Sequence, residues 1–312
     1  MKREKIDCVV WLEWPERCFR VDSAALEYLR GVVPAGSRVT RVKSESAFLR
    51  ALPSATHAVV WRFKAEWYAK APRLKVLATP AAGRELIDAA AAPKGVKVHF
   101  GGFHGPIMAE SVAAFILAWA RGFFQVMSER NAGRGIWPRS RFGGTIGTVA
   151  GTKAVIAGYG RVGRAIGEKL SALGIEVSGF GRSNAADLPR ALAEADWFVL
   201  ALPSDTGTDN FLDAKLLRCL RRSAVVVNVG RGNAIDEEAL KAALEKGRIA
   251  GAYLDVFKDE PTQISEVAQG GKTDGGLWSM ECDRFVPMPH CSAFSPLYIR
   301  KCFEELHDEG LV

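Results

Sequence analysis

Arg231, Glu260 and His290 have side chains that could bind an anion and transfer a proton. Together with Asp255, each lies at or just beyond the carboxyl end of a strand-like apolar segment, the edge at which an open parallel sheet binds ligands. Arginine presents a planar fork of donors to a carboxylate. Histidine titrates near neutral pH, and a neighbouring carboxylate holds it protonated and fixes its tautomer. The residues therefore predict acid–base chemistry on an anionic substrate.

Each of these residues also has a plain structural interpretation. Arg231 could be a surface residue at a helix entry, and Glu260 a turn residue before Pro261. His290 could be a histidine after Pro289 whose hydrogen bonds are satisfied. Three such coincidences at one sheet edge are the less economical explanation.

A glycine-rich loop gives the strongest local signal. In AVIAGYGRVGRAIG, residues 154–167, an apolar run ends at Gly158, and Gly158-x-Gly160-x-x-Gly163 opens a helix-like segment. The first glycine permits a tight turn, the second lets a pyrophosphate approach the backbone, and the third allows close helix–strand contact. Unpaired amides at the helix start face the phosphates. We expect a dinucleotide cofactor here, the alternative being a structural turn. Its expected contacts are Gly158, Tyr159, Gly160, Arg161, Val162 and Gly163.

The end of the next strand bears on the choice of cofactor. NAD enzymes usually carry an acidic residue there to accept hydrogen bonds from the ribose 2′-hydroxyl. Gly181 occupies that position, and Arg182 and Ser183 follow it. A guanidinium and a hydroxyl in place of a carboxylate favour a 2′-phosphate. We therefore expect NADP(H), and the alternative is a surface arginine beside a site that still takes NAD.

The chain as a whole alternates strand-like and helix-like segments, which is typical of parallel α/β sheets. The strands predicted in the first part are 6–11, 38–42, 57–61, 74–78 and 96–100, and the helices 23–30, 45–51 and 84–90. A long apolar helix is predicted over 107–124, and a Gly-, Arg- and Ser-rich connector over 131–148. The later strands are 153–157, 176–180, 197–202, 224–229, 251–254 and 284–286, and the helices 162–173, 188–195, 214–220, 237–246 and 295–311.

Composition disfavours several other classes of protein. Of the 312 residues, 48% are hydrophobic and 25% are charged, a globular balance with room for two domains of roughly 150 residues each. The net charge of +7 comes from scattered basic residues, so we expect no nucleic-acid partner. No run of about 18 apolar residues occurs, so we expect no membrane span and a cytoplasmic protein. The six cysteines lack metal-ligand spacing, so we expect no metal site.

The order of the motifs resembles that of the D-isomer-specific 2-hydroxyacid dehydrogenase family, over most of the chain. The similar blocks are GYGRVGRAIG, LPSDTGTDNFLD (202–213), VNVGRGNAIDEEAL (227–240), GAYLDVFKDEP (251–261) and PMPH (287–290). The resemblance implies that Arg231 binds substrate, that Glu260 is the partner of His290, and that His290 is the acid–base. It also implies cofactor contacts at Leu202, Pro203, Val229 and Asp255.

The resemblance further implies a loop in the first domain whose backbone amides bind the substrate carboxylate. That loop corresponds to residues 79–83, between a predicted strand and the helix expected over 84–90. Because Pro80 has no N–H, the expected donors are Ala81, Ala82 and Gly83, near a helix start that favours anions. The alternative is an ordinary connection between a strand and a helix.

Three features depart from the family pattern. Gly230 stands where the family usually has alanine, and Met288 where it usually has threonine. Glu260 and His290 are 30 residues apart, about ten more than the family implies, and the polar, Gly-rich segment 263–276 is interpreted as a surface loop insertion.

The resemblance implies an α/β fold of two domains. Residues 123–291 would form a Rossmann doubly wound parallel sheet, and 1–122 plus 292–312 a flavodoxin-like substrate domain. The expected activity is transfer of a hydride between NADP(H) and C2 of a small 2-oxoacid, with glyoxylate or hydroxypyruvate first, and the buried-looking helix 107–124 suggests a homodimer. The alternatives are a dinucleotide-sensing binding protein, or another family enzyme such as phosphoglycerate dehydrogenase.

Overall fold

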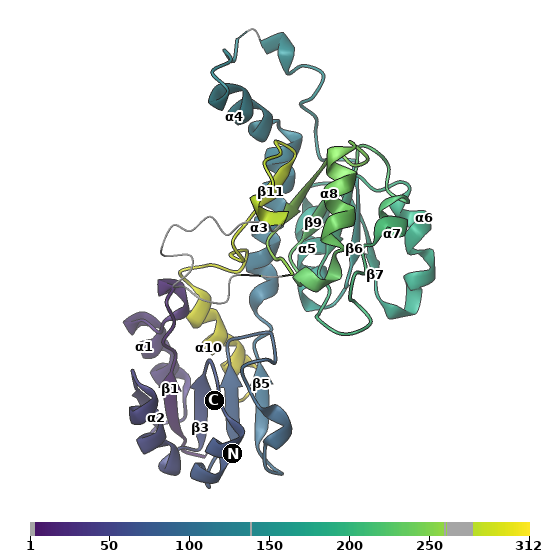
Figure 1. The fold of residues 1–312 in the computed structure, drawn as a ribbon. Coiled ribbons are helices and arrows are strands. Elements are labelled where there is room, and N and C mark those ends of the chain that lie inside the picture. Colours follow the sequence, from purple (N-terminus) through teal and green to yellow (C-terminus); the bar gives the residue numbers. More distant parts are fainter. Residues whose placement is uncertain (1–3, 138, 259, 261–276) are drawn as a thin grey trace. The chain divides into compact units, whose positions relative to one another are not determined.

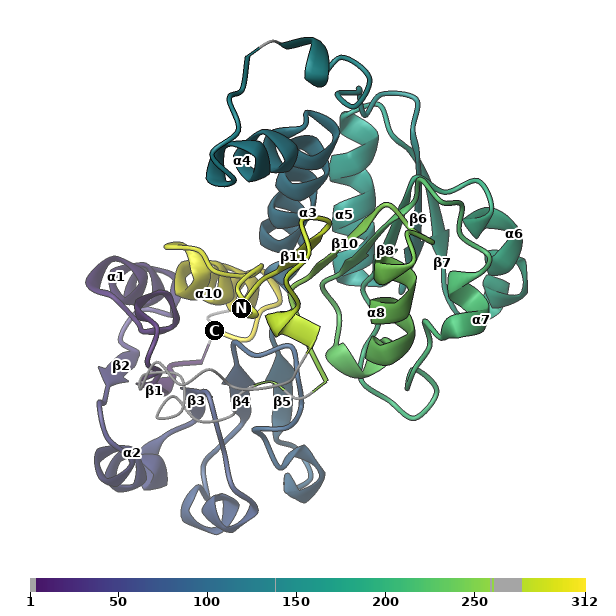
Figure 2. The same ribbon diagram turned by 45° about the horizontal axis from the view of Figure 1, so that its top comes forward.

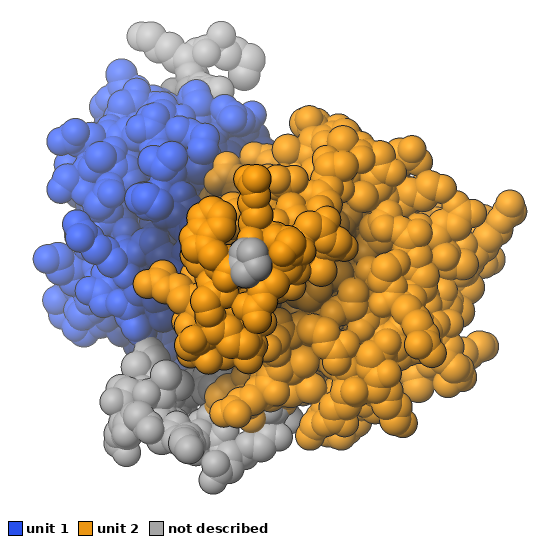
Figure 3. All heavy atoms as spheres, turned by 90° about the horizontal axis from the view of Figure 1, so that it is seen from above, with its two compact units in different colours: residues 1–104, 294–312 blue, residues 105–293 orange. Residues whose placement is uncertain are grey.

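The computed structural model describes residues 4–137, 139–258, 260 and 277–312. Its chain divides into two compact units (Figure 3). The first unit comprises residues 1–104 and 294–312, and the second comprises residues 105–293. The segment 263–276, which the sequence analysis interprets as an insertion, lies outside the described residues, as does Pro261, which follows Glu260.

The first unit is built on a five-stranded parallel sheet (Figure 1). Its strands, all labelled in Figure 2, have the order β2-β1-β3-β4-β5. This is the flavodoxin-like strand order. The strands are β1 (Asp7–Trp11), β2 (Arg38–Arg41), β3 (His57–Val60), β4 (Val76–Thr79) and β5 (Lys97–Phe100). The α-helices are α1 (Ser23–Val32), α2 (Glu45–Ala51) and, from the end of the chain, α10 (Tyr298–Asp308).

The prediction of a helix over residues 84–90 is wrong. The segment forms only the 3₁₀ turn Ala89–Ala91. Ile87 forms a parallel bridge with Phe63, in which the Phe63 amide donates to Leu86 and the Asp88 amide donates to Phe63. Ile87 is buried, so pairing and burial override the helix preference of the alanine-rich sequence.

The second unit is built on a six-stranded parallel sheet in the order β11-β10-β9-β8-β6-β7. The strands are β6 (Lys153–Ala157), β7 (Glu176–Phe180), β8 (Trp197–Leu200), β9 (Val225–Asn228), β10 (Gly251–Leu254) and β11 (Phe285–Pro287). The chain runs from β6 outward to β7 and then returns to the other side of β6 at β8. This reversal is the switch point of a doubly wound sheet, the position at which such sheets bind nucleotides. The predicted class, two parallel α/β sheets, is confirmed.

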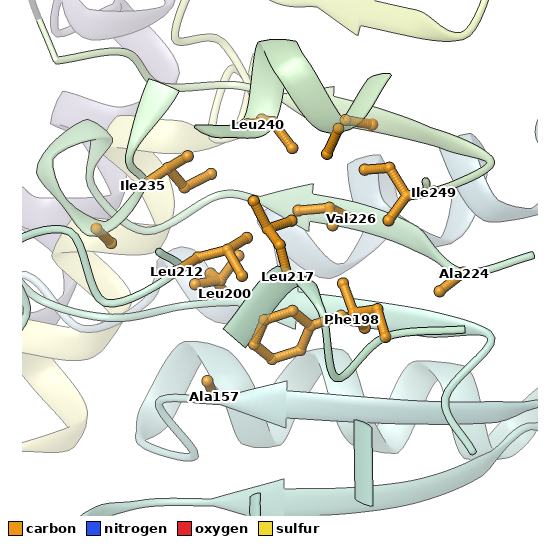
Figure 4. Close-up of a cluster of buried hydrophobic side chains, with 14 of the residues drawn as sticks. Ala157, Phe198, Leu200, Leu212, Leu217, Ala224, Val226, Ile235, Leu240 and Ile249 are labelled. Atoms are coloured by element: carbon orange, nitrogen blue, oxygen red, sulfur yellow. The ribbon is translucent and has the colours of Figure 1, made fainter. Parts of the chain in front are cut away.

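Two layers of helices cover this sheet (Figure 2). On one face, α6 (Leu188–Leu192), α7 (Ala214–Leu217) and α8 (Glu237–Glu245) pack on the strands. Figure 4 shows Leu217 and Leu240 from these helices against Phe198, Leu200 and Val226 of the strands. Burial of each such side chain contributes roughly 1.5–3 kcal/mol. On the other face lie α3 (His104–Ala120) and α5 (Arg161–Ala172).

The single long helix predicted over 107–124 is broken in the structure. α3 ends at Ala120, α4 runs from Phe123 to Asn131, and the two axes differ by 65°. Gly122 lies between them with φ of +70°, a conformation that glycine adopts without strain. In the described part of the chain no single helix has the length and apolar character needed to cross a membrane, and α3 with α4 meets that test only as a bent pair.

Candidate active site

The glycine-rich loop connects β6 to α5 at the switch point, and its glycines have three different surroundings. Gly158 has φ of +91°, and a Cβ there would lie 2.5 Å from the Ala201 carbonyl oxygen. A Cβ on Gly163 would lie 2.3 Å from the Gly158 carbonyl oxygen. A Cβ on Gly160 would meet no described atom within 4 Å. Two glycines are therefore required by the protein's own packing, whereas Gly160 borders open space at the start of α5.

The open space at Gly160 leads to a paired prediction. Gly160→Ala should cost less than about 1 kcal/mol of stability, as at other helix N-caps, yet weaken dinucleotide binding by about tenfold or more. Gly163→Ala should destabilise the fold by about 1–3 kcal/mol, because its Cβ overlaps backbone. Thermal unfolding and NADPH titration of both variants check this pair. A Gly160→Ala protein that binds NADPH normally would contradict placement of the pyrophosphate at this loop.

The other predicted cofactor residues around this loop differ in how deeply they are buried. The Tyr159 ring packs where Gly179 and Gly167 lack side chains, beneath the Arg164 guanidinium, so its aromatic group serves packing between β7 and α5. Val229 is buried in the sheet core. The remaining predicted cofactor residues comprise the partly buried Val162 and Leu202 and the exposed Arg161, Ser183 and Pro203.

Arg182 follows β7, and its side chain is 92% exposed. Its Nη2 lies 3.1 Å from the Asp205 carboxylate, which follows β8. The sequence reasoning missed this acidic neighbour, because Asp205 is 23 residues away along the chain. The backbone of Gly181 is tied instead to Asn184, whose Oδ1 accepts from the Gly181 amide at 2.8 Å.

His290 and Glu260 form a hydrogen-bonded pair in the second unit. The His290 Nδ1 lies 2.8 Å from Glu260 Oε2, and Glu260 Oε1 accepts from the Phe257 amide at 3.1 Å. The carboxylate is thus held at both oxygens and fixes which imidazole nitrogen carries its proton. Because Nδ1 faces Glu260, Nε2 is the nitrogen available for a substrate. The His290 side chain is 54% exposed, which leaves it accessible to a ligand.

The electrostatics of this pair favour a protonated imidazole. The hydrogen bond to Glu260 is the largest influence and raises the pKa of His290 above its ordinary value, against an opposing effect of burial. The charges of Glu260 and Asp255 also raise that pKa, and Arg231 lowers it. Burial of the Glu260 carboxyl opposes ionisation, but His290, the Phe257 amide and Arg231 together hold the pKa of Glu260 below its ordinary value.

A Glu260→Gln substitution tests this electrostatic coupling. The acid form of His290 is present below its pKa and lost as the pH rises through it. Because Glu260 raises that pKa, its removal should move the loss of the 2-oxoacid reduction expected from the sequence to lower pH. The pH dependence of kcat/KM for the variant and the unaltered protein measures the shift. A profile that stays in place or moves to higher pH would contradict the coupling.

Arg231 lies just after β9 in a loop that touches both neighbouring strand ends. A Cβ on Gly230 would lie 2.6 Å from the backbone of Leu202, and one on Gly232 would lie 2.0 Å from the backbone of Phe257. The two glycines therefore let the loop pack between the loops after β8 and β10. The Arg231 Nη1 donates to the Gly230 carbonyl at 2.9 Å. The loop thus presents Arg231 beside Glu260 and His290, whose ionisation it influences.

Asn228 is a positioning residue that the sequence reasoning missed. It is fully buried at the end of β9. Its Oδ1 accepts from the Gly230 amide at 3.0 Å, and its Nδ2 donates to the Arg231 carbonyl at 3.1 Å. The side chain thus closes the turn that carries Arg231. One polar residue ending the otherwise apolar strand VVVN was the available signal.

Asp255 follows β10 and is 1% exposed. Its Oδ1 accepts from the Cys291 amide at 2.9 Å, and its Oδ2 accepts from the Ser292 amide at 3.0 Å. These bonds fix the chain directly after His290, whose φ of +52° is uncommon for a residue other than glycine. The structure thus shows Asp255 holding the backbone that carries His290, and its predicted cofactor contact stays a prediction.

The predicted carboxylate-binding loop lies in the first unit, after β4. The Ala81 amide donates to Thr79 Oγ1 at 3.2 Å, and the Gly101 amide donates to the Ala81 carbonyl at 3.0 Å. Since no α-helix follows, the helix-start argument for Ala81, Ala82 and Gly83 is lost. Their substrate role stays a prediction that rests on ordinary backbone donors. The structure brings Arg231, Asp255, Glu260 and His290 together in the second unit.

Comparisons with known proteins identify relatives of this chain and similar folds. The family model described as D-isomer specific 2-hydroxyacid dehydrogenase, NAD binding domain, matches residues 113–292. A glycerate dehydrogenase of Methylorubrum extorquens is 32% identical over 213 residues, covering 65% of this chain and 67% of that protein. A glyoxylate reductase of Thermococcus kodakarensis is 31% identical over 228 residues, covering 66% and 67%. A D-lactate dehydrogenase structure from Treponema pallidum has a TM-score of 0.77 at 22% identity, covering 97% of this chain and 95% of that one.

Proposed function

Because the chain belongs to the D-isomer specific 2-hydroxyacid dehydrogenase family, we propose that it reduces a small 2-oxoacid with NADPH. The first candidate substrates are glyoxylate and hydroxypyruvate. The observation that carries the proposal is the His290–Glu260 pair beside Arg231, in the same unit as the glycine loop. The sequence similarity to a glycerate dehydrogenase and a glyoxylate reductase supports this substrate class.

The residues around the glycine loop fit a bound dinucleotide. Gly160 borders open space at the amino end of α5, where unpaired amides favour a pyrophosphate. We propose that Arg182, two residues after β7, binds the 2′-phosphate with its guanidinium, and this role is our reason for proposing NADP(H) over NAD. When bound, the nicotinamide supplies the hydride that C2 receives.

The side chains divide the remaining work between binding and proton transfer. Arg231 holds the substrate carboxylate and polarises the C2 carbonyl with its planar fork of donors. His290 donates a proton from Nε2 to the oxygen on C2 as negative charge develops there. Glu260 keeps that imidazole protonated and oriented. Asp255 and Asn228 act through the backbone, by fixing the chain after His290 and the turn before Arg231.

We assign dinucleotide binding to residues 123–291 and substrate binding to residues 1–122 with 292–312. We also propose a homodimer. Large apolar side chains are exposed on and after α4: Phe123 is 62% exposed, Met127 49% and Trp137 74%. A second copy that covers them would remove this apolar surface from water. Light scattering that gives twice the mass of one chain would support the dimer.

A cofactor and substrate panel tests the proposed function. The protein should oxidise NADPH with glyoxylate or hydroxypyruvate and show a higher kcat/KM for NADPH than for NADH. Arg182→Gln should reduce that preference by about tenfold, since it removes one charge-assisted contact to the 2′-phosphate. Binding of NADPH without turnover of any 2-oxoacid would contradict the enzyme and favour a dinucleotide-sensing protein.

A further inference from the structure

The ion pair between Arg182 and Asp205 joins the segments that follow β7 and β8 in the second unit. Arg182 comes two residues after β7, and Asp205 comes five residues after β8. β7 and β8 are the two neighbours of β6 in the sheet. All three strands are parallel, so their carboxyl ends lie at one edge. The ion pair therefore passes over the carboxyl end of β6, where the loop of Gly158 and Gly160 begins.

The Asp205 carboxylate is held in position by its own turn. Its Oδ1 accepts from the Gly207 amide at 2.9 Å, and Oδ2 faces Arg182. Thr208 Oγ1 accepts from the Asp205 amide at 3.0 Å and donates to the Pro203 carbonyl at 2.8 Å. The turn is thus anchored on the segment after β8. The Gly207 amide and the Thr208 hydroxyl thus hold Asp205 through contacts that do not involve Arg182.

We propose that Asp205 is a specificity-determining residue. Its carboxylate partly neutralises the positive charge of Arg182 and thereby reduces the enzyme's preference for NADPH over NADH. This inference rests on the proposed 2′-phosphate site at Arg182. A phosphate that reaches the guanidinium brings up to about two negative charges next to a fixed carboxylate. The phosphate either shares the guanidinium with the Asp205 carboxylate, which contacts Nη2, or displaces that contact. A 2′-hydroxyl carries no charge, so NADH escapes this competition.

The expected size of the effect follows from the exposure of the pair. The Arg182 side chain is 92% exposed and that of Asp205 35%, so solvent and salt screen their charges. Loss of the Asp205 charge should tighten NADPH binding about fivefold, and change NADH binding by less than about twofold. The gain should shrink when the salt concentration rises from about 0.05 M to 0.5 M.

The experiment compares four proteins with one control protein by fluorescence titration with NADPH and with NADH. The four are the unaltered chain, Asp205→Asn, Arg182→Gln and the double variant. Asparagine retains an oxygen for the Gly207 amide, so the turn should persist. Asp209→Asn, which removes an exposed acidic charge four residues further on, is the matched control. The expected result is a fivefold gain in NADPH affinity for Asp205→Asn, and less than a twofold gain when Arg182 is already glutamine or when Asp209 is changed.

Two further outcomes distinguish a failure of the role proposed for Asp205 from a failure of the proposed 2′-phosphate site at Arg182. If Arg182→Gln lowers the preference for NADPH but Asp205→Asn leaves it unchanged, the role of Asp205 is overturned and the 2′-phosphate site stands. If Arg182→Gln leaves the preference unchanged, the 2′-phosphate site is overturned together with the inference. An equal gain in NADPH affinity for Asp205→Asn and Asp209→Asn also overturns the role of Asp205, since the gain would then come from the change in net charge.

Discussion

His290→Gln is expected to lower kcat for 2-oxoacid reduction by about 10²- to 10⁴-fold, the range for loss of a positioned general acid. Glutamine can donate a hydrogen bond to the oxygen on C2, but it cannot transfer a proton. Stopped-flow or steady-state oxidation of NADPH with glyoxylate or hydroxypyruvate measures the loss. The pH dependence assigned to His290 should disappear from whatever activity remains.

The His290→Gln protein should otherwise resemble the unaltered one. The His290 side chain is 54% exposed, so its replacement leaves no core cavity, and thermal unfolding should change little. NADPH affinity should stay within about twofold, because the glycine loop is untouched. A variant that folds, binds NADPH and retains full kcat would show that another group donates the proton.

Arg231→Lys is expected to lower kcat/KM for the 2-oxoacid by about 10²- to 10³-fold, the size of effect typical of a lost charge-stabilising donor. Lysine keeps the charge but loses the planar fork that binds a carboxylate through two parallel hydrogen bonds. It also loses the contact of Nη1 with the Gly230 carbonyl. KM should rise and kcat should fall, since the same group binds the carboxylate and polarises the carbonyl.

Arg222→Lys provides the matched control for this prediction. Arg222 is exposed and lies three residues before β9, whereas Arg231 lies three residues after it. The same chemical change at the opposite end of the strand should leave kcat/KM within about twofold. Equal losses for the two variants would contradict a specific role for Arg231 at the carboxyl edge of the sheet.

Local periodicity and turn chemistry were enough to predict most of the elements. β6, β7 and β10 have the predicted bounds, because their strand-like segments are short and bounded by turn residues. The helix predicted over 84–90 failed, since the Phe63–Ile87 bridge depends on a partner far away in sequence. The break at Gly122 was missed because a glycine inside an apolar run indicates a bend only weakly.

Arg231, Asp255, Glu260 and His290 lie together in the second unit because motifs at strand ends meet at one edge of a parallel sheet. The individual side-chain contacts within the site could not be predicted from the sequence. Asp255 binds the amides after His290, 36 residues along the chain, and Arg182 pairs with Asp205 across β6. Neither contact leaves a pattern in the sequence, because both depend on how separate loops fold over the sheet edge.

Isotope tracing tests the central claim most directly. NADPH with deuterium on the transferable position at C4 of the nicotinamide is supplied with glyoxylate or hydroxypyruvate, and the hydroxy acid formed is analysed by mass spectrometry. We predict one deuterium at C2 of the product, and a strong loss of labelled product with His290→Gln or Arg231→Lys. Product without deuterium at C2, or labelled product formed equally fast by those variants, would contradict the account.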